Sequence, residues 1–158
     1  EAQLDRFLVK IDVGYPPEAA ERAILDHYAM GFHAQRTNSF GVHPVVDEEG
    51  LHQLRQRVAA VHVERSVRAY ITGIVRATRD DPAFAVGASP RAGVALFLTA
   101  RAGALLEGRD FVTPDDVKGL VRPVLRHRVV LTPEVEVEGG EVDPYLDRVV
   151  ESVEAPRG

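Results

Sequence analysis

The chain has 158 residues, 45% of them apolar and 27% charged, with a formal net charge of −5. This composition is typical of one folded globular domain, or of a small domain with part of a neighbour, and it argues against a disordered chain. The acidic balance argues against a nucleic-acid partner, the absence of cysteine excludes disulfides and thiolate metal sites, and no apolar run is long enough for a membrane span. We therefore expect a cytoplasmic protein.

The first predicted element is a short strand. Residues 7–13 (FLVKIDV) are rich in apolar and β-branched side chains and are followed by the turn sequence GYPP at 14–17. A single strand is not stable alone, so it would have to join a sheet that the rest of this sequence does not provide.

Two helices and a loop are predicted next. One helix spans about 17–30, with a proline in its first turn and Gly31 near its end, and a second spans 47–60. Residues 31–46 lie between them and show little apolar periodicity; they include Thr37, Asn38, Ser39, Gly41 and Pro44. This loop is interpreted as a linker between modules, or as a surface that faces a partner.

The second half of the chain has helical periodicity almost throughout. A third helix starts near Val63 and stops before Pro82, with an apolar face made of Val63, Val67, Tyr70, Ile71, Ile74 and Val75. A fourth starts at the cap Ser89 and ends near Gly108, with a predicted apolar stripe of Val94, Phe97, Leu98, Ala102 and Leu105.

The C-terminal part predicts two more helices. One opens at Thr113 with a proline and two acidic residues, and it ends at the basic string 126–128 (RHR), which suits the negative end of the helix dipole. Residues 129–140 could form an extended hairpin or a surface loop, and a last helix spans about 144–153. No internal repeat is present.

Motifs for independent catalysis are missing from this sequence. It contains no glycine-rich phosphate-binding loop, no strand ending in paired acids, and only two lysines, Lys10 and Lys118. The histidines do not pair at helical spacing, so no metal site is expected, and no GxSxG motif is present.

Two arginines are candidates for function. Arg6 precedes the predicted strand, and Arg91 lies in the first turn of the fourth helix, where a cation opposes the helix dipole by roughly 0.3–1 kcal/mol. Either arginine could instead be an ordinary solvated surface residue.

Several short strings together resemble one protein family. In order they are LDRF (4–7), ATR (77–79), GASPRA (87–92), ARA (100–102), GRDFV (108–112) and VLRHR (124–128). Their order and spacing resemble the C-terminal portion of the MoxR-type AAA+ ATPases, up to about residue 131.

The resemblance implies roles for both arginines. Arg6 matches the arginine finger, which acts in trans on a neighbouring subunit's nucleotide, and Arg91 matches sensor 2, which contacts nucleotide in its own subunit or in a neighbour. A fixed guanidinium stabilises charge that develops on a transferred phosphoryl group. The implied cofactors of the intact protein are ATP and Mg²⁺, held by motifs that would precede residue 1, and none is expected for this fragment alone.

The resemblance also divides the chain. Residues 1–16 would be the end of an α/β core, 17–46 a connecting helix and loop, 47–131 the helical lid with sensor 2, and 132–158 a tail with a short helix. The expected fold class is therefore mainly α, a helical bundle of the AAA+ lid type, preceded by a short strand that belongs to a missing α/β core.

The expected function is that of the lid part of a chaperone-like ATP hydrolase. The resemblance implies a homo-oligomeric ring, expected as a hexamer, that remodels or activates client proteins, some with von Willebrand A domains. The fragment alone is expected neither to bind nor to hydrolyse ATP. The alternative is a stand-alone helical adaptor that kept the lid fold without the motor. A DNA-binding domain is disfavoured because the best predicted helices are apolar on one face and carry mixed charge on the other, rather than a basic recognition face.

Overall fold

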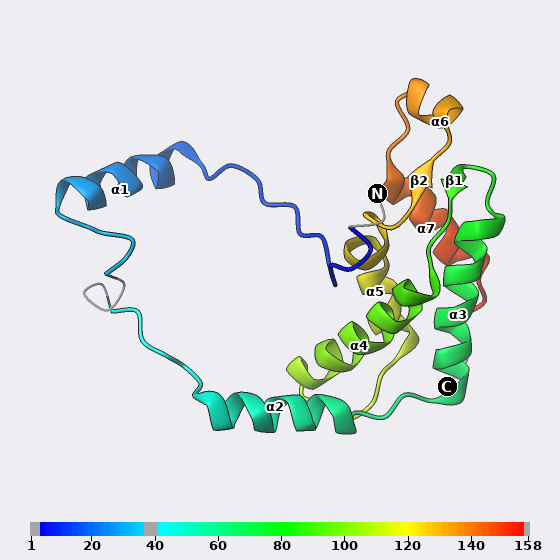
Figure 1. Ribbon diagram of the computed structural model, residues 1–158, viewed down its shortest axis with the longest axis horizontal. Helices are drawn as coiled ribbons and strands as arrows, with labels where there is room; N and C mark the ends of the chain where they lie inside the picture. Colours follow the sequence, from blue (N-terminus) through cyan, green and yellow to red (C-terminus); the bar gives the residue numbers. More distant parts are fainter. Residues whose placement is uncertain (1–3, 37–40, 157–158) are drawn as a thin grey trace. The chain divides into compact units, whose positions relative to one another are not determined.

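The computed structural model describes residues 4–36 and 41–156 and is mainly α-helical, as the sequence predicted (Figure 1). The described elements, in order, are α1 (Glu18–Ala29), α2 (Glu48–Ala60), α3 (Arg65–Asp80), β1 (Phe84–Val86), α4 (Pro90–Leu106), α5 (Pro114–Leu125), β2 (Val130–Leu131), α6 (Pro133–Val137) and α7 (Val142–Ser152). The chain divides into two compact units, residues 12–54 and residues 1–11 together with 55–158.

The unit of residues 12–54 contains α1 and the first part of α2. Helix α1 follows Pro17, has two glutamates in its first turn, and ends at Ala29, two residues before Gly31, whose φ of 90° favours glycine. Neither α1 nor α2 buries a residue in the described chain. Residues 31–36 and 41–46 lie outside helices and strands, as predicted, whereas Thr37, Asn38 and Ser39 lie outside the described residues.

The second unit has its core between four helices. Helix α4 packs against α3 and α5, and α7 packs against the same two helices (Figure 1). The apolar face predicted for α3 is buried, with Ile74 fully inaccessible. Each buried side chain of this size contributes roughly 1.5–3 kcal/mol relative to an exposed one, so this face is a main source of stability.

The apolar stripe predicted for α4 is wrong at Val94 and Leu98. Val94 and Leu98 are 58% and 45% exposed, whereas the inaccessible positions of this helix are Ala92, Ala95, Leu96, Ala100 and Ala104. Apolar residues occur on every side of α4, so periodicity alone could not select the buried face. The small alanines allow close approach to α3 and α5, Leu96 is the large side chain at this contact, and Phe97 and Leu105 are partly buried against the core.

The strand predicted at 7–13 is absent from the described residues. This segment is irregular, and the Lys10 N–H donates to the carbonyl oxygen of Pro123 at the end of α5. A strand needs a ladder partner, and the two described strands pair with each other, β1 antiparallel to β2. Residues 129–140, predicted as an extended hairpin or a surface loop, form neither of these: strand β2 pairs with β1 and is followed by the short helix α6.

Hydrogen bonds join the strings ATR (77–79) and GASPRA (87–92). The hydroxyl of Thr78, fully buried, accepts from the Ala88 N–H at 2.9 Å, and Arg79 Nε donates to the Ala88 carbonyl at 2.8 Å. Both polar groups of the Ala88 backbone are thereby paired with the end of α3. Gly87 permits this approach, because a Cβ there would lie 2.7 Å from the Arg79 Cα and the Thr78 carbonyl oxygen.

A Gly87→Ala substitution is therefore expected to destabilise the fold by about 1–3 kcal/mol, the usual cost of overpacking against backbone. Denaturant unfolding of the chain measures it. Gly103→Ala is the matched control, because its Cβ would meet nothing within 4 Å inside α4, and it should stabilise by roughly 0.5–1 kcal/mol. Equal effects of the two substitutions would contradict the close approach at Gly87.

The string GRDFV fixes the start of α5. Thr113 and Asp116 form a capping box, and Arg109 donates to both carboxylate oxygens of Asp116, at 2.8 and 2.5 Å. Burial raises the pKa of Asp116, but hydrogen bonds from Arg109 and Thr113 outweigh it, so that the net shift of this pKa is downward. These contacts give the string a structural role between α4 and α5.

Candidate functional site

The candidate site lies where residues 4–10 meet the C-terminal end of α5 and the N-terminal end of α4. Arg128 forms its centre, and its side chain is 1% exposed. Its Nε donates to Asp5 Oδ1 at 3.1 Å, and Nη1 and Nη2 donate to the carbonyl oxygens of Leu8 and Asp5 at 3.1 and 3.2 Å. Nη2 also donates to the Phe7 carbonyl and Nη1 to the Val124 carbonyl.

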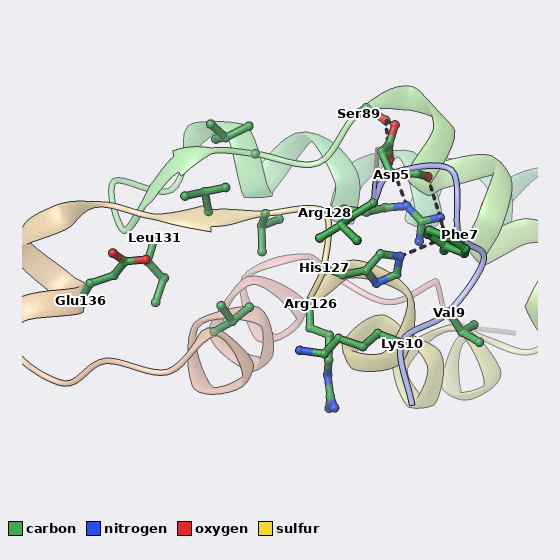
Figure 2. A pocket seen from close by; sticks show the side chains of 16 residues that line it. Asp5, Phe7, Val9, Lys10, Ser89, Arg126, His127, Arg128, Leu131 and Glu136 are labelled. Carbon is green, nitrogen blue, oxygen red and sulfur yellow. Dashed lines mark hydrogen bonds and ion pairs between the residues drawn. The ribbon is translucent and has the colours of Figure 1, made fainter. Parts of the chain in front are cut away.

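All five N–H donors of the Arg128 guanidinium are therefore used. Four of these bonds go to residues 5–8, and the neighbouring His127 adds a contact of 3.0 Å from Nε2 to the Phe7 carbonyl. Figure 2 shows the Arg128 head group between Asp5 and Phe7, with His127 directed to Phe7 from the adjacent position. The end of α5 thus fixes the backbone on both sides of Arg6.

Asp5 extends this network to α4. The Ser89 hydroxyl donates to Asp5 Oδ2 at 3.1 Å, and Ser89 occupies the N-cap position of α4 without making a side-chain cap hydrogen bond. The sequence correctly predicted Ser89 as the N-cap residue, but its hydroxyl is directed to Asp5 rather than to the helix amides. An aspartate at this helix end also suits the positive end of its dipole.

The two candidate arginines flank this network. Arg6 is exposed, and its guanidinium carbon lies 5.3 Å from the centre of the Phe7 ring. Arg91 is exposed in the first turn of α4, two residues after Ser89. Asp5 therefore links the segment of Arg6 to the start of the helix that carries Arg91.

The electrostatics of the site are mainly positive. Burial lowers the pKa of the Arg128 guanidinium, the hydrogen bond and charge of Asp5 raise it, and the positive charge of nearby Arg91 lowers it, with a net downward shift. An arginine stays charged in spite of such a shift. Asp5 thus compensates a buried cation, and the exposed guanidinium groups are available to an anion.

An open cavity of about 820 Å³ adjoins the network. Residues 4–10, the end of α5, β2 and the α6–α7 region contribute to its lining, which includes Lys10, His127 and Leu131 (Figure 2). Its surface is mostly apolar. In this region Arg126 donates to Asp143 at 2.6 Å, which connects the end of α5 to the start of α7.

The described residues contain neither a candidate metal centre nor a candidate membrane span. Over residues 4–36 and 41–156, no group of three or more His, Asp or Glu side chains is arranged to hold a metal ion. Within the same ranges, no helix has both the length and the apolarity needed to cross a bilayer.

The sequence predicted Arg6 and Arg91 as site residues, which stays a prediction, and it did not predict the contact between Arg128 and Asp5. The string RHR was interpreted as a favourable charge at the end of α5, which explains a cation near this position but not a buried one. Because Asp5 and Arg128 are 123 positions apart, no local pattern could have paired them. The available signal was that this string carries more basic residues than the helix dipole requires.

The comparisons with known proteins agree on one family. A family model described as "AAA lid domain" matches residues 76–149. The chain is 35% identical to Chaperone MoxR1 of Mycobacterium tuberculosis, over 99% of this chain and 42% of that protein, and 32% identical to Protein MoxR of Methylorubrum extorquens, over 98% and 50%. It is also 37% identical to the uncharacterised protein YeaC of Bacillus subtilis, over 99% and 47%.

A solved structure shares the fold. The crystal structure of a putative ATPase from Cytophaga hutchinsonii superposes with a TM-score of 0.84 and 28% identity, covering 99% of this chain and 48% of that one. The chain spans about half the length of the curated relatives it matches. Its string motifs, its helical fold and these relatives agree: the chain carries an AAA lid domain and, over nearly its whole length, is similar to about half of each MoxR protein.

Proposed function

We propose that this chain is the lid-bearing portion of a ring-forming, chaperone-like ATPase and that it supplies two arginines to nucleotide sites. Arg6 acts as the arginine finger in a neighbouring subunit's site, and Arg91 acts as sensor 2. One observation carries the proposal: the backbone around Arg6 is fixed by Arg128 while the Arg6 side chain itself is exposed.

The residues present fit a phosphate group in part. Two exposed guanidinium groups near one network suit the planar, bidentate recognition of phosphoryl oxygens. ATP supplies the phosphoanhydride bond that is hydrolysed, together with the charge that these groups would stabilise. The glycine-rich loop and the acidic ligands of Mg²⁺ have no counterpart in this sequence, so in this proposal the rest of the site comes from the remainder of the intact protein.

The energetic argument explains why a fixed backbone matters. An arginine that is ordered before the reaction loses little conformational entropy on contacting the transition state, and its charge is not neutralised by mobile water. The network of Asp5 and Arg128 provides that order at Arg6. One relative is named Chaperone MoxR1, which supports a role on client proteins. Clients with von Willebrand A domains are part of the proposal.

The first experiment compares this chain with the full-length protein. Calorimetric titration of the isolated 158-residue chain with Mg·ATP and Mg·ADP is expected to give no binding heat up to millimolar nucleotide. The full-length protein is expected to bind both nucleotides and to hydrolyse ATP as an oligomer, measured by phosphate release and by light scattering.

Two results would contradict the proposal. Saturable micromolar binding by the isolated chain would place a complete nucleotide site within these residues. Full ATP turnover by a monomeric full-length protein would exclude an arginine that acts between subunits.

A further inference from the structure

We infer that Arg128 and Asp5 are positioning residues, which hold Arg6 at a fixed place relative to the start of α4, so that Arg6 and Arg91 move as one body with the lid. This inference rests on the proposed function, because it concerns how the chain places the two arginines. The observation behind the inference is the buried guanidinium of Arg128, which donates hydrogen bonds to residues 5–8.

The bonding pattern favours positioning over simple packing. A buried arginine can be satisfied by any set of acceptors, yet four of the five donors here contact the residues that surround Arg6. The remaining donor contacts Val124, in the last turn of α5. The guanidinium therefore joins the Arg6 segment to α5 directly.

The second half of the link is the Ser89 hydroxyl. At an N-cap, serine usually accepts a hydrogen bond from an amide of its own helix, which stabilises the helix. Ser89 instead donates to Asp5, at 3.1 Å to Oδ2 and 3.3 Å to Oδ1. The start of α4, which holds Arg91, is thus joined to the same carboxylate that Arg128 contacts.

The geometry of the fork makes lysine a poor substitute. An ammonium group has three donors at one point, so it cannot reach the Asp5 carboxylate, the Leu8 carbonyl and the Val124 carbonyl from one rigid plane. Arg128→Lys keeps the charge and most of the side-chain volume but loses the planar guanidinium and its five donors. Arg128→Lys is therefore the most specific test of the guanidinium geometry. Asp5→Asn is a second variant, which keeps the side-chain shape and removes its charge on a segment outside the helical core.

The test is a double-mutant cycle in the full-length protein. Arg128→Lys should lower single-turnover ATP hydrolysis by about 10- to 100-fold, the scale of a misplaced catalytic group, with nucleotide binding retained. In an Arg6→Ala background the same substitution should change turnover by less than about twofold, because the group that it positions is gone. Arg122→Lys is the matched control, since Arg122 pairs with Asp147 at 2.8 Å on the exposed side of α5.

A structural readout accompanies the kinetics. Amide exchange measured by mass spectrometry should be faster over residues 4–10 in Arg128→Lys, because the Lys10 N–H to Pro123 bond depends on this attachment. Exchange in α3 should be unchanged. The same pattern is expected, more weakly, for Asp5→Asn.

The outcomes separate the inference from the proposed function. If Arg128→Lys lowers turnover equally with and without Arg6, or leaves exchange over 4–10 unchanged, Arg128 does not act through Arg6 and the inference is overturned. If Arg6→Ala alone leaves turnover unchanged, the proposed role of Arg6 fails, whatever the exchange shows. Loss of the effect in the Arg6→Ala background supports both.

Discussion

Replacing Arg6 with alanine is expected to reduce ATP turnover of the full-length protein by about 10³- to 10⁵-fold, the range measured where an arginine finger has been removed. Nucleotide affinity should change little, because a finger stabilises charge that develops only in the transition state. Stability should also be retained, since Arg6 is exposed. Steady-state phosphate release and nucleotide titration measure the two quantities.

Arg6→Lys is the matched variant for this prediction. It keeps the positive charge but not the bidentate fork, so turnover should stay well below that of the unmodified protein. Mixing tests the action between subunits: Arg6→Ala subunits should regain turnover when mixed with subunits whose own phosphate-binding lysine has been replaced. Absence of recovery would place Arg6 in its own subunit's site or outside catalysis.

The helices could be predicted from sequence because their signals are local. The caps and prolines before α4 and α5, and the apolar face of α3, each depend on residues within a few turns. Helix α6 and strands β1 and β2 are short and carry little periodicity. The two strands exist because they pair with each other, and this pairing joins Phe84 to Leu131, which are far apart in sequence.

The candidate site was predictable only in part. Arg6 and Arg91 were found by resemblance and by an unfavourable charge in a first helical turn. The network that connects them depends on Asp5, Ser89 and Arg128, which three separate segments bring together. Ser89 in particular was predictable as a cap but not as a hydrogen-bond donor to a distant aspartate.

The buried face of α4 shows the same limit. With apolar residues on every side, this helix could bury more than one of its faces, and the choice depends on how closely α3 and α5 approach. Alanines at the contact bring α4 near its neighbours. The position of Arg91 therefore depends on packing that the sequence pattern does not specify.

Arg91→Ala is expected to lower turnover of the full-length protein by about 10- to 100-fold, since a charge-assisted hydrogen bond contributes roughly 1.5–3 kcal/mol. Removing a cation from the first turn of α4 should also stabilise that helix slightly, so a loss of activity cannot come from a loss of folding. Arg76→Ala, an exposed arginine of α3, is the control and should leave turnover unchanged.

The same mixing experiment locates the Arg91 contact. Recovery of turnover with subunits that lack the phosphate-binding lysine means that Arg91 acts on a neighbour's nucleotide, and no recovery means that it acts on its own. Because Ser89 and Asp5 tie the Arg91 helix to the Arg6 segment, a lid that moves with nucleotide state would move Arg6 as well. Turnover of Arg91→Ala equal to that of the unmodified protein would refute the sensor role and leave Arg6 as the chain's contribution to catalysis.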